Sequence, residues 1–311
     1  MAAPTVVYVA GFGRSGTTML ERILGELPGV CALGEVVHLW HRGVELDETC
    51  GCGEPFHRCP FWEEVGNRAY GGWDRLPLAR VETLRKTIDR TRHVPGIAAR
   101  GWMPRLAGKV DEYTAHYRRV YDAAAATAGA SYVIDSSKHP SLAFGLATRS
   151  DLDLRVVHMV RDPRAVAYSW TRTVERPEAG DVEAEMWRYS PARAAMNWFG
   201  QNLLLDRLRH TSVPATLLRH EDMLADARAE VGRVAQWLGL DAGSVPVTAD
   251  GVASLTFAHT VSGNPARFAT GKVRITASDR WRRELPSRDR RAVTALALPL
   301  LAAYGYSASS S

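Results

Sequence analysis

The segment from Val6 to Leu20 constrains the fold of this 311-residue chain more than any other part of the sequence. Its letters, VVYVAGFGRSGTTML, describe an apolar run typical of a buried strand, followed by a glycine-rich turn and a helix start. Glycines let the backbone approach a ligand closely, and the amides and dipole at a helix N-terminus favour an anion. The segment therefore predicts a pocket for a phosphorylated ligand.

Three phosphate-binding patterns overlap on this segment, and they predict different functions. Gly11, Gly13 and Gly16 satisfy G-x-G-x-x-G after a strand. Glu35 stands roughly 20 residues further on, where a dinucleotide-binding oxidoreductase places its ribose carboxylate. The outer glycines also fit G-x-x-x-x-G-K-[ST], but Thr17 stands where a nucleoside-triphosphate kinase needs its lysine. A kinase is therefore not expected.

The third pattern is the run Arg14-Ser15-Gly16-Thr17-Thr18, in which a cation precedes two hydroxyls that can bond a 5′-phosphate. A second segment, VVHMVRDPRAVAYSW at residues 156–170, favours this pattern. It begins as an apolar strand, turns at an Asp-Pro pair and enters a helix with the proline in its first turn. Arg161 falls at the strand's carboxyl end and Ser169 about two helical turns later, so we expect both to face one crevice beside the glycine loop.

These two segments resemble the nucleotide-binding loops of sulfotransferases that use 3′-phosphoadenosine 5′-phosphosulfate (PAPS). In that family, [KR]-S-G-T-[TS] binds the 5′-phosphosulfate and R-[DN]-P-x-[DA]-x-x-x-S holds the 3′-phosphate. A third segment, HTVSGNPARFATGKVRITASDRWRREL at residues 259–285, resembles a stretch of bacterial carbohydrate and natural-product sulfotransferases. By that likeness, Ser262 and Arg267 would close over the bound nucleotide. The cofactor-binding residues that the resemblance implies are Gly13, Arg14, Ser15, Gly16, Thr17, Thr18, Arg161, Ser169, Ser262 and Arg267.

The resemblance, which runs from about residue 6 to about residue 300, implies an α/β fold of the P-loop-like type. This fold is a three-layer sandwich in which helices cover both faces of a central parallel sheet. It also implies transfer of sulfonate from PAPS to a hydroxyl of a sugar, glycolipid or secondary metabolite, with release of adenosine 3′,5′-bisphosphate (PAP). We expect a single domain over residues 1–311, with 35–130 as a largely helical insertion that shapes the acceptor site. A dinucleotide-binding oxidoreductase and a noncatalytic nucleotide-binding protein are the alternatives.

Sulfonate transfer needs a base for the acceptor's proton and cations for the charge on the leaving phosphate oxygen. Glu35 is the predicted base, because protein-tyrosine sulfotransferases carry a similar Gly-Glu motif at this location, although the match is G-E-V rather than G-E-E. Arg14 and Lys138 are the predicted catalytic cations, the lysine following the third expected strand as in the family. His139 is the alternative base, because cytosolic aryl and steroid sulfotransferases use a histidine. The chemistry requires no metal.

Alternation of apolar runs with helical segments predicts a parallel sheet, with its ligand crevice beyond the carboxyl ends of the strands. The expected strands span residues 5–10, 30–33, 131–135, 154–160 and 214–218. The expected helices span residues 17–27, 74–92, 108–128, 140–149, 163–173, 183–210, 226–239 and 287–303.

Charge and composition narrow the function only a little. Lysine and arginine number 39 against 34 acidic residues, a balance that suits an anionic cofactor. The arginines are scattered without interleaved aromatics, so nucleic-acid binding is not expected. The N-terminus has no cationic region before a long apolar run, so we expect a cytoplasmic protein without a membrane span. The oligomeric state cannot be inferred from the sequence.

Three cysteines and a histidine lie close together at Cys50, Cys52, His57 and Cys59, a set that could supply four tetrahedral zinc ligands. Similar C-x-C-G-x-P-x-x-x-C-P-x-W stretches occur in bacterial relatives. The spacing is not a standard zinc pattern, and plain buried thiols also suit a cytoplasmic protein. We expect a structural role for this cluster, with or without a metal.

Overall fold

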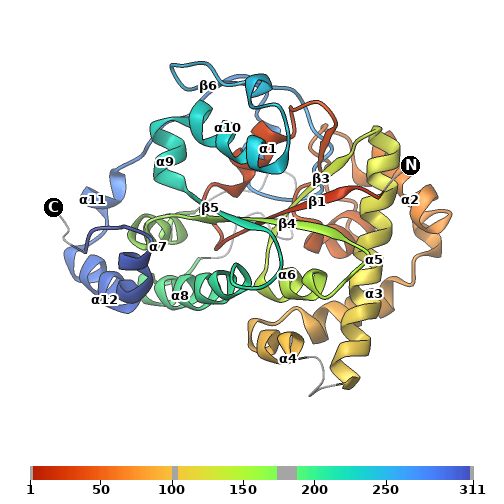
Figure 1. The fold of residues 1–311 in the computed structure, drawn as a ribbon, viewed down its shortest axis with the longest axis horizontal. Coiled ribbons are helices and arrows are strands. Elements are labelled where there is room, and N and C mark those ends of the chain that lie inside the picture. The colour runs from red at the N-terminus through yellow and green to blue at the C-terminus, as the bar shows by residue number, and fades with distance from the viewer. Residues whose placement is uncertain (1–2, 100–103, 174–187, 309–311) are drawn as a thin grey trace.

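The computed structural model describes residues 3–99, 104–173 and 188–308, and its centre is a five-stranded parallel sheet (Figure 1). The strands follow the order β2-β3-β1-β4-β5, and every adjacent pair is parallel. A separate antiparallel pair, β6-β7, was not expected from the sequence. The strands are β1 (Thr5–Ala10), β2 (Val30–Ala32), β3 (Tyr132–Lys138), β4 (Asp153–Val160), β5 (Ala215–Arg219), β6 (Val252–Leu255) and β7 (Gly271–Arg274).

Helices connect these strands, and most of the expected strands and helices are confirmed with small differences at their ends. The helix expected at 74–92 is shorter, Leu78–Ile88, and the helices Pro60–Tyr70, Val94–Ala98 and His220–Ala225 were not expected. The start of the helix expected at 183–210 lies outside the described residues, and α8 begins at Pro191. No helix among the described residues is both long enough and apolar enough to cross a membrane. The α-helices are α1 (Thr17–Leu24), α2 (Pro60–Tyr70), α3 (Leu78–Ile88), α4 (Val94–Ala98), α5 (Pro104–Ala128), α6 (Pro140–Ala147), α7 (Pro163–Thr171), α8 (Pro191–Leu208), α9 (His220–Ala225), α10 (Ala227–Leu238), α11 (Arg280–Glu284) and α12 (Ser287–Ala303).

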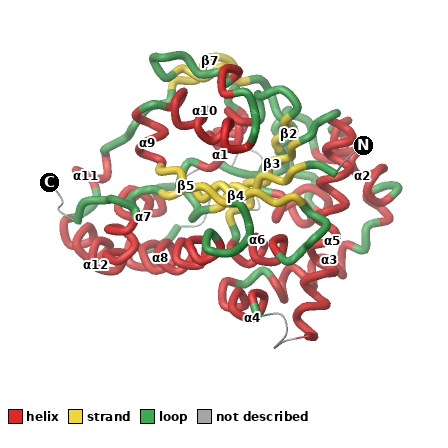
Figure 2. Tube along the Cα trace, in the orientation of Figure 1, coloured by secondary structure: helices red, strands yellow, loops and turns green. Residues whose placement is uncertain are grey.

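Both faces of the sheet are covered by helices, as the alternation of side chains along β1 requires. Val6 and Tyr8 pack with residues of α5 and α6 in one cluster, whereas Val7 and Val9 pack with residues of α1 and α10 in another. Figure 2 shows this arrangement, with the sheet in yellow between two layers of red helices. The expected three-layer α/β fold is confirmed.

The order of the strands separates two of the hypotheses about the glycine loop. In doubly wound dinucleotide-binding folds, the second strand lies next to the first. Here β3 lies between β1 and β2, so Glu35, which follows β2, is two strands away from the loop's own strand. Glu35 therefore does not occupy the place of a ribose-binding carboxylate beside β1.

The segment between β2 and β3 is largely helical in its described part and contains α2, α3, α4 and α5. A short π-helix at Leu39–Glu45 comes directly after the residues that leave β2. Helix α5 packs against both α2 and α3. The helical character expected of this insertion is thus confirmed, and its role in shaping the acceptor site stays a prediction.

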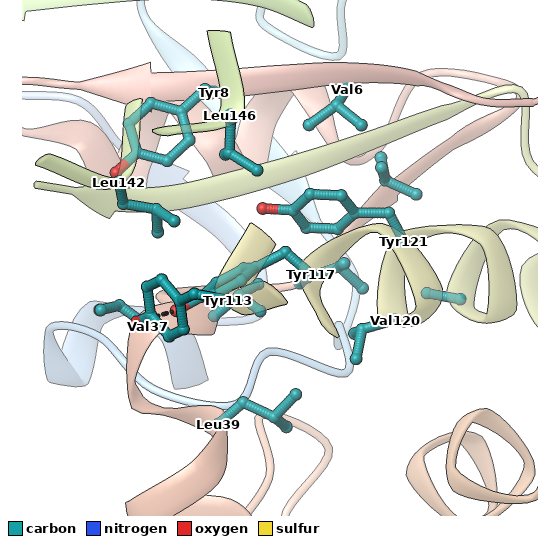
Figure 3. Packing of buried hydrophobic residues seen from close by; sticks show 14 of the residues in the cluster. Val6, Tyr8, Val37, Leu39, Tyr113, Tyr117, Val120, Tyr121, Leu142 and Leu146 are labelled. Carbon is teal, nitrogen blue, oxygen red and sulfur yellow. Dashed lines mark hydrogen bonds between the residues drawn. The ribbon is translucent and has the colours of Figure 1, made fainter. Parts of the chain in front are cut away.

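Buried tyrosines of β1 and α5 belong to one packed cluster (Figure 3), and two of them bond to β3 and to the residue after it. The hydroxyl of Tyr121 donates to Oδ2 of Asp135 over 2.6 Å, and the hydroxyl of Tyr8 donates to the carbonyl of His139 over 2.9 Å. The rings of Tyr8, Tyr117 and Tyr121 are fully buried. Because buried polar groups are costly without partners, these bonds fix the end of β3 against the core.

Candidate active site

A cavity of about 470 Å³ lies at the carboxyl ends of β1, β3 and β4. Open parallel sheets bind ligands at this edge, and the volume is within the range of small-molecule pockets. The loop after β1, the end of β3 and the residue after β4 all contribute to its wall. The sequence-predicted residues in this wall are Gly13, Arg14, Gly16, Thr17, Thr18, Glu35, Lys138, His139, Arg161 and Ser169.

The glycine loop enters α1 through backbone angles that most residues avoid. Gly16 is the N-cap of α1 with φ of 90°, and a side chain there would collide with the ring of His220. Arg14 has φ of 73°, and Lys138, across the cavity wall at the end of β3, has φ of 70°. Positive φ angles strain residues that carry a Cβ, and such strain is concentrated at functional sites.

The hydroxyl residues of the loop fall into two groups. Thr17 and Thr18 form the first turn of α1 and line the cavity, where a helix N-terminus favours an anion. Ser15 is fully buried outside the wall, and its Oγ has no hydrogen-bond partner. The structure therefore places two of the three loop hydroxyl residues in the cavity wall.

Two arginines line the cavity and carry N–H donors that have no hydrogen-bond partner. The guanidinium of Arg14 lies over the ring of Trp170, 5.2 Å from its centroid, and its Nε and Nη2 are buried without a hydrogen-bond partner. Arg161 donates through Nη1 to the carbonyl of Arg14 over 2.9 Å, and its Nε is likewise buried without a partner. Burial lowers the pKa of both arginines from the ordinary value. Unpaired buried N–H groups on a cation are costly, so this corner of the cavity suits an anion.

Trp170 connects the segment around Arg161 to the glycine loop. It follows Ser169 on α7, and its Nε1 donates to the carbonyl of Gly13 over 3.1 Å. A methyl group at Gly13 would come within 2.8 Å of the indole ring. Only glycine therefore lets the loop and the indole approach this closely.

Glu35 and Lys138 form an ion pair in the cavity wall. The Nζ of Lys138 contacts Oε1 of Glu35 and donates to the carbonyl of Ser136 over 3.1 Å, while Nε2 of His38 lies 3.5 Å from Oε2. Burial raises the pKa of Glu35, but Lys138 and His38 outweigh it and hold the pKa well below its usual range. Burial lowers the pKa of His38 to about 4, so its ring is neutral at pH 7. Glu35 is therefore an ionised proton acceptor at neutral pH.

His139, the alternative base, has a different environment. Its Nδ1 lies 2.6 Å from Oδ2 of Asp89, which also accepts from the hydroxyl of Ser141. Burial lowers the pKa of His139, but the Asp89 carboxylate outweighs it, and the pKa is raised above its ordinary value. A raised pKa favours the protonated ring, which cannot accept a proton. Both Glu35 and His139 line the cavity, and the choice of Glu35 as the base stays a prediction.

Ser262 and Arg267 do not lie in the cavity wall, in contrast to the expectation from the resemblance. The guanidinium of Arg267 is buried and donates to the carbonyls of Thr260 and Thr49 over 2.6 and 2.7 Å. The Oγ of Ser262 accepts from Arg42 over 2.9 Å. Arg267 thus joins its own segment to the cysteine loop, and Ser262 bonds a side chain that follows β2, because buried polar groups need partners. Their neighbours Gly263 and Asn264 line the cavity instead.

Sequence reasoning assigned no role in the site to several residues of the cavity wall. His38 lies beside Glu35 on the first turn after β2, and Arg42 lies about one helical turn further along. Trp170 directly follows Ser169 in a segment that was already assigned to the site. Proximity in sequence to a predicted residue was the available signal for these three, and for Asn264, which stands two residues after Ser262.

The cysteine cluster lies outside the cavity wall, and its fourth member is not the expected one. The ligand atoms of Cys50, Cys52, Cys59 and His259 lie within 4.8 Å of one another. His57 is turned elsewhere, with its Nε2 bonded to the carbonyl of Val44 over 2.9 Å. The grouping of His57 with the three cysteines is therefore wrong.

Comparisons with known proteins agree with this geometry. The model of the sulfotransferase family matches residues 4–243. No curated protein matches the sequence significantly. The sulfotransferase domain of an olefin synthase from Synechococcus PCC 7002 matches with a TM-score of 0.51 and 20% identity, and covers 96% of each chain. The sulfotransferase domain from the curacin biosynthetic pathway matches with a TM-score of 0.51 and 15% identity, and covers 99% of each chain.

These two structures share the P-loop-like fold with this chain, and at such low identities their likeness shows the fold alone. The family match covers well over half of the chain and includes the glycine loop, the end of β3 and the segment around Arg161. It leaves no support for the oxidoreductase hypothesis, which the strand order also disfavours. With its parallel sheet, its loop of buried donors and this match, the chain belongs to the sulfotransferase family.

Proposed function

We propose that this protein transfers the sulfonate group of PAPS to a hydroxyl acceptor and releases PAP. The observation that carries the proposal is the pair of partly buried arginines, Arg14 and Arg161, which line one cavity and each carry a buried N–H donor without a hydrogen-bond partner. A ligand with phosphate groups would supply the missing acceptors. Membership of the sulfotransferase family supports this choice over other phosphorylated ligands.

The charge of the wall fits such a ligand. Among its described residues are four cations, Arg14, Arg42, Lys138 and Arg161, against the single carboxylate of Glu35. In a buried site, each charge-assisted hydrogen bond to phosphate contributes about 1.5–3 kcal/mol. The donors of Arg14 and the first turn of α1 suit the 5′-phosphosulfate, and Arg161 with Ser169 suits the 3′-phosphate.

The residues present can perform the chemical step. Bound PAPS supplies a sulfonate whose sulfur is attacked by the acceptor oxygen, as the bond to the leaving phosphate oxygen breaks. Glu35 takes the acceptor's proton, because it is ionised and lines the cavity. The ammonium of Lys138 has three N–H donors, of which Glu35 and Ser136 engage two, and the third is available to the leaving oxygen. Arg14 adds positive charge from the loop.

The acceptor is proposed only as a hydroxyl compound, a sugar, a glycolipid or a secondary metabolite. His38 and Arg42 are the residues through which the helical insertion reaches the cavity. Both residues lie near Glu35. We therefore propose that the acceptor binds on this side of the cavity, because the base must contact the acceptor's hydroxyl.

The affinity of the Arg161→Ala variant for nucleotides tests the proposal. Isothermal titration should show that the variant binds PAP about 10- to 100-fold more weakly than the wild type, while binding of adenosine 5′-monophosphate changes little. The matched control is Arg172→Ala, an exposed arginine at the end of α7. An equal loss for both nucleotides would contradict the assignment of Arg161 to the 3′-phosphate. NADH should not stabilise the protein against heat, whereas PAP should.

A transfer assay separates the enzyme from a noncatalytic nucleotide-binding protein. PAPS labelled in its sulfonate should pass its label to members of a panel of hydroxyl acceptors, and Glu35→Gln should block this transfer. If PAP binds but no acceptor in a broad panel is ever labelled, the protein is a binding scaffold and the proposed transfer is wrong.

A further inference from the structure

We propose that Cys50, Cys52, Cys59 and His259 bind a structural zinc ion. The four side chains come from two segments about 200 residues apart, a loop that precedes α2 and the strap at residues 257–264 that follows β6. Three thiolates and one imidazole are a donor set that selects zinc in tetrahedral geometry. The proposal does not depend on the reaction that the protein catalyses.

Three of the six distances between the ligand atoms are close to those of a tetrahedral zinc centre, and all six are within 4.8 Å. With Zn–S bonds of about 2.3 Å and Zn–N bonds of about 2.05 Å, tetrahedral angles put two sulfurs about 3.8 Å apart and sulfur and nitrogen about 3.6 Å apart. The Sγ atoms of Cys52 and Cys59 are 3.7 Å apart. The Nδ1 of His259 lies 3.2 Å from Sγ of Cys59 and 3.9 Å from Sγ of Cys50. The sulfur–sulfur distance is close to the expected value, and the two sulfur–nitrogen distances lie on either side of theirs.

The surroundings orient the ligands toward one point. The ring of Phe61 stacks on the imidazole of His259, with centroids 4.9 Å apart and planes 11° apart. Outer contacts of this kind fix the orientation of metal ligands.

A disulfide or a set of plain thiols explains the cluster less well. A disulfide needs sulfurs about 2.05 Å apart, and all four cysteines of the chain are free thiols in the structure. A single disulfide would also leave one cysteine and the imidazole without a role in the cluster. Hydrogen bonds between thiols and the imidazole would account for the contacts of Cys59 and Cys50 with His259, but not for the convergence of Cys52 on the same point.

The ion would attach the strap to the body of the protein. The backbone of the strap is also bonded to Leu33 and Glu35 after β2, through Val261 and Ser262, and to Gly51 through Thr260. Directly beyond these bonds, the strap contributes Gly263 and Asn264 to the cavity wall. A zinc ion at His259 would therefore hold one end of a segment that shapes the cavity, without entering the cavity itself.

Metal analysis of tag-free protein purified without chelators tests this proposal. Mass spectrometry of the metal content should find about one zinc ion per chain in the wild type. Cys52→Ser and His259→Gln should lose most of this zinc. His57→Gln and Cys31→Ser are the matched controls, because they change the same residue types outside the cluster, and both should retain it. Retention of zinc by both cluster variants, or its loss only in His57→Gln, would overturn the assignment.

Cobalt exchange gives a second measurement that needs no variant. Wild-type protein stripped by a strong chelator and loaded with Co²⁺ should show the intense visible bands of tetrahedral cobalt and a sulfur-to-cobalt charge-transfer band, both abolished by zinc. Hydrogen exchange should be faster at the amides of Gly51 and Val261 in the stripped protein. A folded, metal-free protein that takes up neither ion, or that carries a disulfide between Cys52 and Cys59, would refute the proposal.

Discussion

The ion pair between Lys138 and Glu35 predicts a large loss of stability when its cation is removed. Lys138→Met keeps the length of the side chain but leaves the Glu35 carboxylate, only 16% exposed, without its closest positive partner. Breaking one side of a buried ion pair costs about 3–5 kcal/mol. With an unfolding entropy of about 2.1 cal/mol/K per residue, this cost lowers the Tm of a chain of this length by about 5–8 °C at pH 7.

The pH dependence of this loss identifies its cause. The pKa of Glu35 in the folded state lies well below its unfolded value of about 4.3. The ion pair therefore stabilises the protein fully above about pH 5, and this contribution is lost as the pH falls through the folded-state pKa. Thermal unfolding of wild type and variant should show a gap in Tm that is widest at pH 7 and narrows toward pH 3.

Two control variants make the result specific to this pair. Lys109→Met removes an exposed lysine on α5 and should change the Tm little. Combining Lys138→Met with Glu35→Gln removes both charges, and the double variant should regain most of the lost stability. A Lys138→Met protein with the Tm of the wild type, or with a gap that does not change with pH, would refute the reasoning.

Two further predictions concern turnover and a buried acid. Glu35→Gln should lower kcat by about 10²- to 10⁴-fold with nearly unchanged affinity for PAP, whereas His139→Asn should lower kcat less. If steady-state kinetics show the larger loss of kcat in His139→Asn, His139 is the base. Burial raises the pKa of Glu21 to about 7, despite hydrogen bonds from Ser136 and Gly34, so its contribution to stability is lost as the pH rises from about 4.3 through 7. Between pH 5 and pH 8, this effect should lower the free energy of unfolding by about 2–3 kcal/mol, as measured by urea unfolding, and Glu21→Gln should abolish the decrease. The same decrease in the variant would show that another group causes it.

The fold could be predicted from the sequence because its signals are local. The strands of the central sheet are apolar runs, and the glycine loop and the Asp-Pro turn mark the points where β1 and β4 end. The carboxyl ends of parallel strands share one edge, so the convergence of Arg14, Lys138 and Arg161 followed from the strand assignment. The β6-β7 pair was missed, because its two short strands are weakly apolar and separated by a long connection.

The parts of the site that depend on distant contacts could not be predicted. His259 joins cysteines about 200 residues earlier in the chain, and no local spacing reveals such a partner. The same limit explains Arg267, whose buried guanidinium bonds a carbonyl from the cysteine loop rather than facing the cavity. The contact between Lys138 and Glu35 likewise depends on β2 and β3 being neighbours, which periodicity alone does not determine.

The distribution of the cavity wall over the sheet has a consequence for the order in which the protein loses its functions on unfolding. Arg14, Lys138 and Arg161 come from β1, β3 and β4, whereas Glu35 and Arg42 follow the edge strand β2. Opening of the sheet at the β2 edge would separate the acid from the arginines while β3, β1 and β4 stay paired. Loss of turnover should therefore precede loss of nucleotide affinity when heat or denaturant damages this molecule.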